Sequence, residues 1–99
     1  MFLELENKTV VITGAASCIG KACAQIFARE GSRLFLLDIN KEGVEAVANE
    51  IRTDDRDVFT MTVDISVESE VQKAFEAIQK KAGCLDVLIN SAGVINFDK

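Results

Sequence analysis

The chain has 99 residues, 48% of them hydrophobic and 27% charged, which is the balance of a single globular domain with its own core. A net charge of -5 with scattered lysines and arginines argues against a nucleic-acid surface, and no apolar stretch approaches the roughly 20 residues that cross a bilayer. The acidic N-terminus also lacks the basic start of a signal peptide, so we expect no nucleic-acid partner, no membrane segment and a cytoplasmic location.

The first predicted strand is Thr9–Thr13, a β-branched run bounded by turn formers. Such a run is typical of a strand buried on both faces. From about Cys18 to Glu30 apolar residues recur at helical spacing, and Gly31 stands where a left-handed C-terminal cap falls. The inner face expected for this helix consists of Ile19, Ala22, Cys23, Ile26 and Phe27.

The second predicted strand is Arg33–Asp38. Asn40 follows it and can cap a helix, because its side-chain oxygen can accept a hydrogen bond from the first turn. The expected inner face of this second helix consists of Val44, Val47, Ala48 and Ile51. The polar sequence TDDRD, residues 53–57, then predicts a turn.

The third predicted strand, Val58–Asp64, alternates and finishes on an acid. Ser66 is expected to cap a third helix that has acids near its start and lysines near its end, as the helix dipole favours. The buried stripe of this helix is predicted to be Val71, Ala74, Phe75 and Ile78. After Gly83, the segment Val87–Ile89 predicts a fourth strand.

The resulting order is βαβαβαβ within one domain over residues 1–99. Strands separated by helices imply parallel pairing with right-handed crossovers. The predicted fold is therefore α/β, a Rossmann-like doubly wound parallel sheet with strand order 3-2-1-4. In such sheets ligands bind beyond the carboxyl ends of the strands, next to the point where the order reverses. That edge is expected to carry Gly14, Asp38, Asp64 and Asn90.

The sequence TGAASCIG, residues 13–20, joins the first strand to the first helix and has the character of a phosphate-binding loop. Gly14 permits a tight turn, and Gly20 lets helix and strand pack closely. Ser17 can add a hydroxyl donor to the backbone N–H groups of the loop and of Ile19. The alternative is an ordinary turn into a helix, which also needs glycine.

Two acids follow strands at suitable distances for an adenosine nucleotide. Asp38 comes eighteen residues after Gly20, where a carboxylate accepts hydrogen bonds from the ribose and repels a 2′-phosphate. Ile39 beside it is not basic, so NAD is favoured over NADP. Asp64 can accept from the adenine amino group, with Ile65 as an apolar contact. As alternatives, Asp38 simply precedes a turn, and Asp64 simply favours a helix start.

The three cysteines stand at no spacing typical of a metal site, and the chain contains no histidine. We therefore expect reduced thiols and no metal. The chain also lacks tyrosine, so neither an imidazole nor a phenol group among these residues can transfer protons.

Together these motifs resemble the N-terminal, cofactor-binding half of the short-chain dehydrogenase/reductase family. Its pattern is T-G-x-x-x-G-x-G, an acid after the second strand, D-[VIL] after the third and N-N-A-G after the fourth, and the match runs from about Leu5 to Val94. The resemblance implies a nicotinamide dinucleotide cofactor and hydride transfer to or from an alcohol or carbonyl substrate. The cofactor-binding residues it implies are Thr13, Gly14, Ser17, Cys18, Ile19, Gly20, Asp38, Asp64, Ile65, Asn90, Ser91, Ala92 and Gly93.

Two residues depart from the family pattern. Ser91 replaces the second asparagine of N-N-A-G, a mild change because a hydroxyl and the backbone remain. Cys18 replaces a glycine, and a disfavoured dihedral there would cost roughly 1 to 3 kcal/mol, about 5- to 150-fold in affinity. Three interpretations of Cys18 stay open: a damaging change in the cofactor loop, one tolerated by a small loop shift, or a reactive thiol at a helix N-terminus.

The catalytic Ser and Tyr-x-x-x-Lys of the family lie beyond its fourth strand, and this chain has no tyrosine. We therefore expect a cofactor-binding half, truncated or naturally short, that is not catalytic alone. An unpaired apolar fourth strand also predicts homo-oligomers that form through its edge. The alternative is a non-catalytic Rossmann-like interaction module. A methyltransferase-like domain is less favoured, because its glycine spacing differs.

Overall fold

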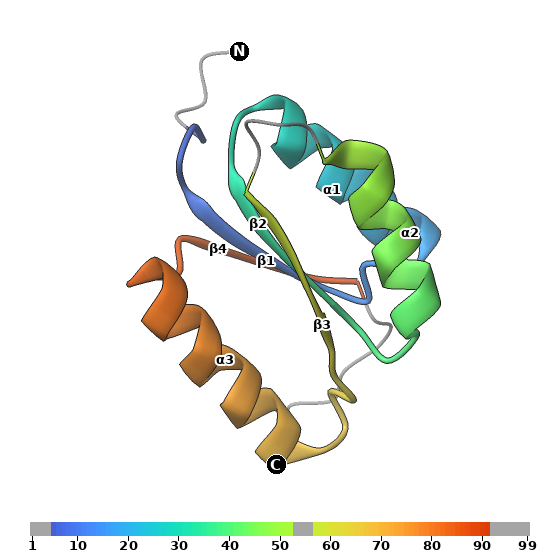
Figure 1. The fold of residues 1–99 in the computed structure, drawn as a ribbon, viewed down its shortest axis with the longest axis vertical. Coiled ribbons are helices and arrows are strands. Elements are labelled where there is room, and N and C mark those ends of the chain that lie inside the picture. The colour runs from blue at the N-terminus through green and yellow to red at the C-terminus, as the bar shows by residue number, and fades with distance from the viewer. Residues whose placement is uncertain (1–4, 53–56, 92–99) are drawn as a thin grey trace.

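The computed structural model of the chain describes residues 5–52 and 57–91, which form four strands and three helices. All strand pairs are parallel, and the sheet order is β3-β2-β1-β4, as predicted. Helices α1 and α2 cover one face of the sheet and α3 covers the other (Figure 1). The elements are β1 (Thr9–Thr13), α1 (Cys18–Arg29), β2 (Arg33–Asp38), α2 (Lys41–Ile51), β3 (Val58–Thr62), α3 (Glu68–Ala82) and β4 (Val87–Asn90). The predicted α/β doubly wound fold is confirmed.

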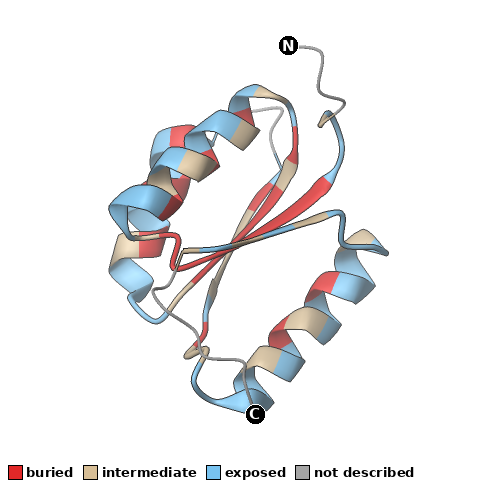
Figure 2. Cartoon of the chain, turned by 180° about the vertical axis from the view of Figure 1, so that it is seen from behind, coloured by how far each residue is buried: buried red, intermediate tan, exposed pale blue. Residues whose placement is uncertain are grey.

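The strands β1 and β2 form the centre of the sheet and are buried on both faces (Figure 2). Alternate residues such as Val10 and Leu36 belong to the core beneath α1 and α2, whereas Val11 and Phe35 belong to the core beneath α3. The side chain of Phe35 is fully buried and stacks on Phe59 with 5.0 Å between ring centroids. This alternation fixes the register, because a slip by one residue would exchange the two faces.

The inner face predicted for α1 is wrong in part. Gly20, Ala24 and Ala28 are buried against the sheet, with Cys23 and Phe27 half-buried beside them. Ala22, Ile19 and Ile26 are instead exposed, Ile19 by 68%. The physical reason is that the helix presents its smallest residues to the sheet and so lies close to the backbone of β1, which the apolar spacing alone did not indicate.

The predicted N-cap of α2 is confirmed: Asn40 Oδ1 accepts a hydrogen bond from the Gly43 amide at 3.0 Å. All four residues predicted for the inner face of α2 are buried. Gly31 follows α1 with a φ of 85°, as its expected left-handed cap requires. Residues 53–56, most of the predicted polar turn, lie outside the described residues.

The predicted cap of α3 is wrong. The N-cap position belongs to Val67, which makes no side-chain capping bond. The hydroxyl of Ser66 instead donates to Asp64 Oδ1 at 2.6 Å, and Glu70 Oε1 accepts from the Asp64 amide at 2.9 Å. The Ser66 hydroxyl is not available to cap α3, because it already donates to Asp64. The carboxylates of Asp64 and Glu70 therefore hold this turn.

The predicted stripe of α3 does face the sheet. Ala74 and Ile78 are buried, and Val71 and Phe75 are half-buried against the same core. Within the described residues, neither α3 nor any other helix has the length and apolar character needed to cross a membrane.

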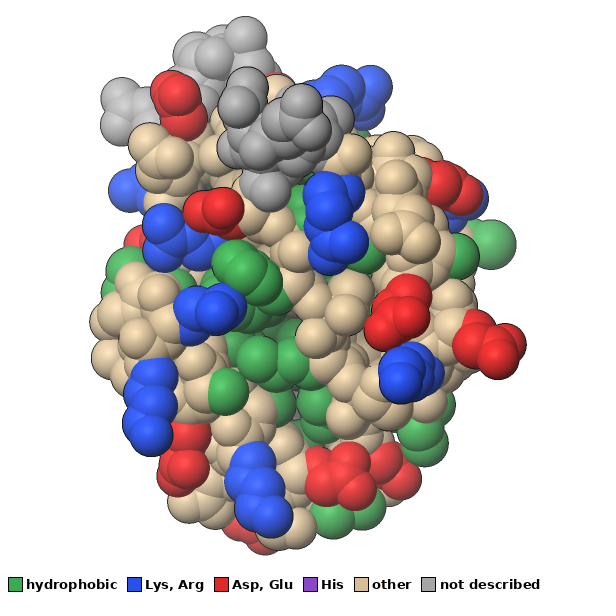
Figure 3. Space-filling model, viewed as in Figure 1, with side chains coloured by type: hydrophobic (Ala, Val, Ile, Leu, Met, Phe, Trp, Pro, Cys, Tyr) green, Lys and Arg blue, Asp and Glu red, His purple; other side chains and the backbone are tan. Residues whose placement is uncertain are grey.

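The edge strand β3 leaves apolar side chains partly open to solvent. Figure 3 shows hydrophobic side chains gathered between α3 and the layer of α1 and α2, with lysine and arginine side chains around them. Phe59 and Met61 of β3 are half-buried, and Lys81 Nζ lies 4.8 Å from the centre of the Phe59 ring. Lys81 of α3 thus covers part of the apolar face of this edge strand with a charged side chain.

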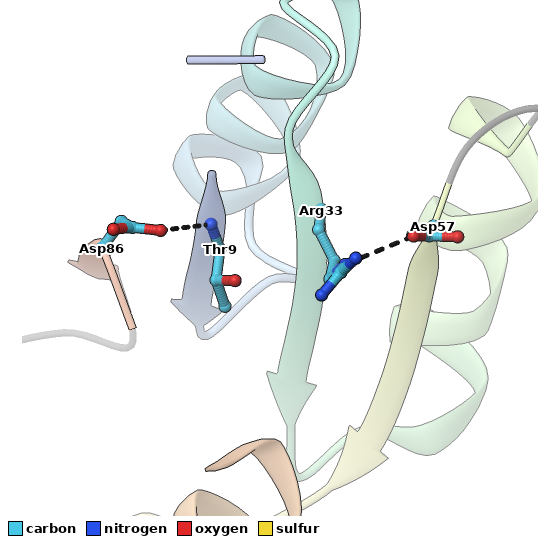
Figure 4. Close-up of polar contacts among 4 residues, drawn as sticks. All are labelled: Thr9, Arg33, Asp57 and Asp86. Atoms are coloured by element: carbon cyan, nitrogen blue, oxygen red, sulfur yellow. Dashed lines mark hydrogen bonds and ion pairs between the residues drawn. The ribbon is translucent and has the colours of Figure 1, made fainter. Parts of the chain in front are cut away.

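The amino-terminal edge of the sheet is held by side chains (Figure 4). Asp86 Oδ2 accepts from the Thr9 amide at 2.8 Å, which fixes the start of β4 beside β1. Arg33 Nε lies 3.2 Å from Asp57 Oδ2 between β2 and β3. This edge is opposite the carboxyl ends of the strands, which are left for the connecting loops.

Candidate functional site

A cavity of about 230 Å³ lies at the carboxyl ends of the strands. It brings together six of the predicted site residues, although these are far apart in the sequence. Ile39 and Val63 also line it and were not among the predicted site residues; Val63 could have been found from its place before Asp64 at a strand end. The six predicted residues are Gly14, Ser17, Asp38, Asp64, Ile65 and Ser91.

The other predicted site residues do not line this cavity. Thr13 at the end of β1 and Gly20 in α1 are buried, and Asn90 lies at the end of β4. Cys18 and Ile19 are exposed in the first turn of α1. The last two predicted residues, Ala92 and Gly93, lie outside the described residues.

The loop between β1 and α1 turns sharply at Gly14, whose φ is 66°. The hydroxyl of Ser17 donates to the Gly14 carbonyl at 2.8 Å and accepts from the Gly20 amide at 3.1 Å, so it caps the helix. Its proton is therefore directed into the loop rather than toward the cavity. Ser17 thus organises the backbone of the loop, a role the sequence analysis did not assign to it.

The amides of Cys18 and Ile19 are the available donors at the start of α1. The first amides of a helix have no intrahelical acceptor, and no hydrogen bond within residues 5–52 and 57–91 engages these two. The helix dipole adds about half a positive charge at this end. Two unpaired amides at a helix N-terminus favour an anion such as a phosphate.

Cys18 does not carry the backbone strain that the sequence suggested. In the described ranges Asn7 is the one residue other than glycine with a positive φ. Cys18 is the first residue of α1 and its thiol is exposed. The expected dihedral cost of replacing glycine there is therefore wrong, since a helical N-terminal position accepts any L side chain.

The close packing predicted at Gly20 is confirmed. A Cβ on Gly20 would overlap the Gly14 carbonyl oxygen and would lie 2.7 Å from Ser91 Oγ and 2.8 Å from the Cα of Ala15. Gly14 and Ala15 belong to the loop and Ser91 ties β4 to it, so only glycine at this position lets α1 start this close to the loop.

Asp38 ends β2 with both carboxylate oxygens engaged. Oδ2 accepts from the Ala16 amide at 2.9 Å, and Oδ1 accepts from the Asn40 amide at 2.8 Å. The sequence analysis expected Asn40 to cap the next helix but had no signal for the contact between Asp38 and Ala16. An ionised carboxylate has about four lone-pair positions, so room remains for further donors.

Asp64, after β3, is the second acid that lines the cavity. Hydrogen bonds from the Ser66 hydroxyl and amide lower the pKa of the Asp64 carboxyl below its ordinary value of 3.8. A lowered pKa means that the contribution of this carboxylate to stability is present at neutral pH and is lost as the pH falls through its folded value. Asp64 is therefore an acceptor at neutral pH.

Ser91 ties the end of β4 to the loop. Its hydroxyl lies 2.7 Å from the Thr13 carbonyl oxygen and 3.2 Å from that of Gly14, and its amide donates to the Thr13 carbonyl at 3.1 Å. The Thr13 hydroxyl in turn donates to Asn90 Oδ1 at 2.9 Å. Serine in place of asparagine thus keeps a hydrogen-bonding side chain under the loop.

No set of three or more His, Cys, Asp or Glu side chains in the described part of the chain is grouped to hold a metal ion. The three cysteines are free thiols.

Comparison with known proteins identifies the family. Residues 8–99 match the family described as short chain dehydrogenase. YxbG, an uncharacterized oxidoreductase of Bacillus subtilis (strain 168), is 43% identical over 91 residues, which are 92% of this chain and 33% of that protein. The chain thus spans about one third of the length of this relative.

Solved structures of the family share the fold. A 3-ketoacyl-(acyl-carrier-protein) reductase from Brucella melitensis complexed with NADH is 40% identical, with a TM-score of 0.76 over 85% of this chain and 33% of its own. A glucose/ribitol dehydrogenase of the same organism is 34% identical, with a TM-score of 0.86 over 97% of this chain and 39% of its own. By sequence match and by fold, the chain belongs to the short-chain dehydrogenase family.

Proposed function

We propose that the chain is the NAD-binding part of an oxidoreductase that transfers hydride between a nicotinamide cofactor and an alcohol or carbonyl substrate. The observation that carries this proposal is that two unpaired helix amides and the carboxylates of Asp38 and Asp64 all lie at the carboxyl-end edge of the parallel sheet. The NADH complex of the Brucella reductase supports it. The bound cofactor would supply the hydride, and the residues of this chain would hold it.

Each part of a dinucleotide has a fitting partner here. The amides of Cys18 and Ile19 suit the pyrophosphate, and the carboxylate of Asp38 suits the ribose hydroxyls. Asp64 suits the adenine amino group, with Ile65 as an apolar neighbour. The cavity is smaller than the typical 300 Å³ or more of a complete ligand pocket, and its lining includes the residues assigned to the ribose and the adenine, so we place only the adenosine half of the cofactor there.

We assign NAD rather than NADP on charge. A 2′-phosphate on the ribose would lie next to the carboxylate of Asp38, and the two negative charges would repel each other. Ile39 is the neighbouring wall of the cavity, and none of the cavity-lining residues in the described part of the chain is basic. We assign no catalytic residue, since the chain has no tyrosine and so supplies no Tyr-x-x-x-Lys pair.

Titration of the chain with NADH and NADPH, followed by nucleotide fluorescence, tests the proposal. We expect NADH to bind and NADPH to bind at least about tenfold more weakly, equivalent to about 1.4 kcal/mol. A Cys18→Gly variant is expected to bind NADH no more than about fivefold more tightly, about 1 kcal/mol, because Cys18 has no dihedral strain to relieve and only the bulk of its side chain is removed.

Cys84→Gly is the matched control, because Cys84 is also exposed but lies before β4, at the opposite edge of the sheet. It is expected to leave the affinity unchanged. Failure of the chain to bind either nucleotide would contradict the proposal, and equal affinities would contradict the NAD assignment.

A second candidate, self-association through β4, is favoured by one exposed apolar residue. Leu88 is 51% exposed on the α3 face of the sheet. It lines a cavity of about 230 Å³ together with Leu37, Ile65, Val71 and Phe75. In the described part of the chain β4 pairs only with β1, so its other side offers backbone hydrogen-bonding groups.

Sedimentation at high protein concentration tests this second candidate. We expect dimers or larger species for the unchanged chain and a shift toward monomer for Leu88→Lys, because a charge at an edge strand blocks pairing. Leu85→Lys is the control, since Leu85 is 41% exposed but precedes β4. A strictly monomeric profile of the unchanged chain would rule this candidate out. If neither NAD nor the Cys18→Gly substitution changed the degree of self-association, an interaction module would be favoured over a cofactor-binding unit.

A further inference from the structure

We propose that Asp38 is a positioning residue for the phosphate-binding loop, in addition to the ribose-binding role proposed above. In this role its carboxylate fixes the backbone of the loop before any nucleotide arrives. The inference rests on the proposed function, because it assigns a second task to a residue of the same site.

The contact with the loop is direct. Asp38 Oδ2 accepts from the amide of Ala16 at 2.9 Å, and Ala16 lies midway between Gly14 and the helix start. A hydrogen bond to an ionised acceptor is roughly twice as strong as one between neutral groups. The amide of Ala15 is bonded to the Leu37 carbonyl at 3.1 Å, so two successive loop amides are held by the end of β2.

The same carboxylate also holds the start of α2. Its Oδ1 accepts from the amide of Asn40, the residue that caps α2 through Gly43. Gly43 in turn lies against the loop, since a Cβ there would come within 2.9 Å of the Ala16 Cβ. One side chain therefore joins the loop after β1 to the first turn of α2.

This geometry gives Asp38 two tasks, binding the ribose and holding the loop. The ribose would use lone pairs that remain on Asp38, while the pyrophosphate depends on a loop that Asp38 already holds. Replacing Asp38 to admit a 2′-phosphate would then also loosen the loop. Loss of the carboxylate should weaken even ligands that have no ribose hydroxyls to offer.

The binding test uses 2′,3′-dideoxyadenosine diphosphate, which keeps the adenine and both phosphates but lacks the hydroxyls. We expect Asp38→Ala to bind this probe about fivefold more weakly, the size of one lost hydrogen bond. If Asp38 served only the hydroxyls, removal of its negative charge would leave the affinity of this anion unchanged or raise it. Either of those results would overturn the inference.

Asp57→Ala is the matched control, because Asp57 is an acid at the opposite edge of the sheet, paired with Arg33 (Figure 4). It removes the same charge without touching the loop. We expect it to leave the affinity for the probe unchanged. A loss equal to that of Asp38→Ala would show a general effect of charge or stability and would overturn the inference.

Amide hydrogen exchange of the nucleotide-free chain, followed by NMR, tests the loop without any ligand. We expect the Ala16 and Asn40 amides to exchange at least about tenfold faster in Asp38→Ala. Asp38→Asn is a gentler second variant: its single oxygen can hold only one of the two amides, so at least one must exchange faster. Unchanged exchange of both amides in both variants would overturn the inference. If the unchanged chain bound no nucleotide, the proposed function would fail while this measurement still decided the role of Asp38.

Discussion

A Gly20→Ala variant is expected to lose about 1 to 3 kcal/mol of unfolding free energy and its affinity for NADH together. The added Cβ would overlap the Gly14 carbonyl oxygen and crowd Ser91 Oγ and the Cα of Ala15. Two of these atoms are backbone, so the strain can be relieved only by moving α1 away from the loop. Such a movement would displace the amides of Cys18 and Ile19 from the site. Thermal unfolding and NADH titration of the same preparation measure the two effects.

The control for this prediction is Gly83→Ala. Gly83 ends α3 with a φ of 84°, and a Cβ there meets nothing within 4 Å. Alanine should cost about 1 to 2 kcal/mol because of the left-handed backbone, yet leave NADH affinity unchanged. Separate behaviour of the two variants would show that the loss at Gly20 is local to the site. Normal binding and stability of Gly20→Ala would contradict the geometry of the loop.

The order of elements along the chain could be predicted from the sequence because each signal was local, and the strand order followed from the rules for parallel sheets. The strand Thr9–Thr13 and the helix cap at Asn40 could be predicted without knowledge of the residues that pack against them. The face of α1 could not be predicted in this way. Ile26 fits the helical spacing but is exposed, because the sheet accepts only the small side of this helix. Which face of α1 packs on the sheet depends on the distance between α1 and β1, which is set by the tertiary structure.

The candidate site shows the same division. Asp38 and Asp64 could be placed at one edge, since the carboxyl ends of parallel strands lie together. The partners of these acids could not be foreseen, because the contact of Asp38 with the amide of Ala16 joins residues 22 positions apart. Ser17 was expected to donate to a ligand, but the nearby Gly14 carbonyl accepts its proton. The partners in both hydrogen bonds are backbone groups, which are the same in every residue and so leave no signal in the sequence.

Phe35→Ala is expected to have the largest effect on stability, a loss of about 3 to 5 kcal/mol. Phe35 is fully buried at the centre of β2, where its ring packs on the α3 side of the sheet and stacks on Phe59. Domains of this size have about 5 to 15 kcal/mol of stability in total, so the variant would lose at least about a fifth of it. Denaturant unfolding followed by circular dichroism measures the change.

Phe59→Ala is the matched control, because it removes the other ring of the same stack from an edge strand where the side chain is only half-buried. It should cost less than Phe35→Ala, since fewer contacts are lost and solvent can fill the space. The comparison also bears on the site, because β2 carries Phe35 toward the α3 core and ends at Asp38. If the two variants lost equal stability, Phe59 at the β3 edge would contribute as much to the core as Phe35. The stability of β2, and with it the position of Asp38, would then depend on the packing at the β3 edge as well.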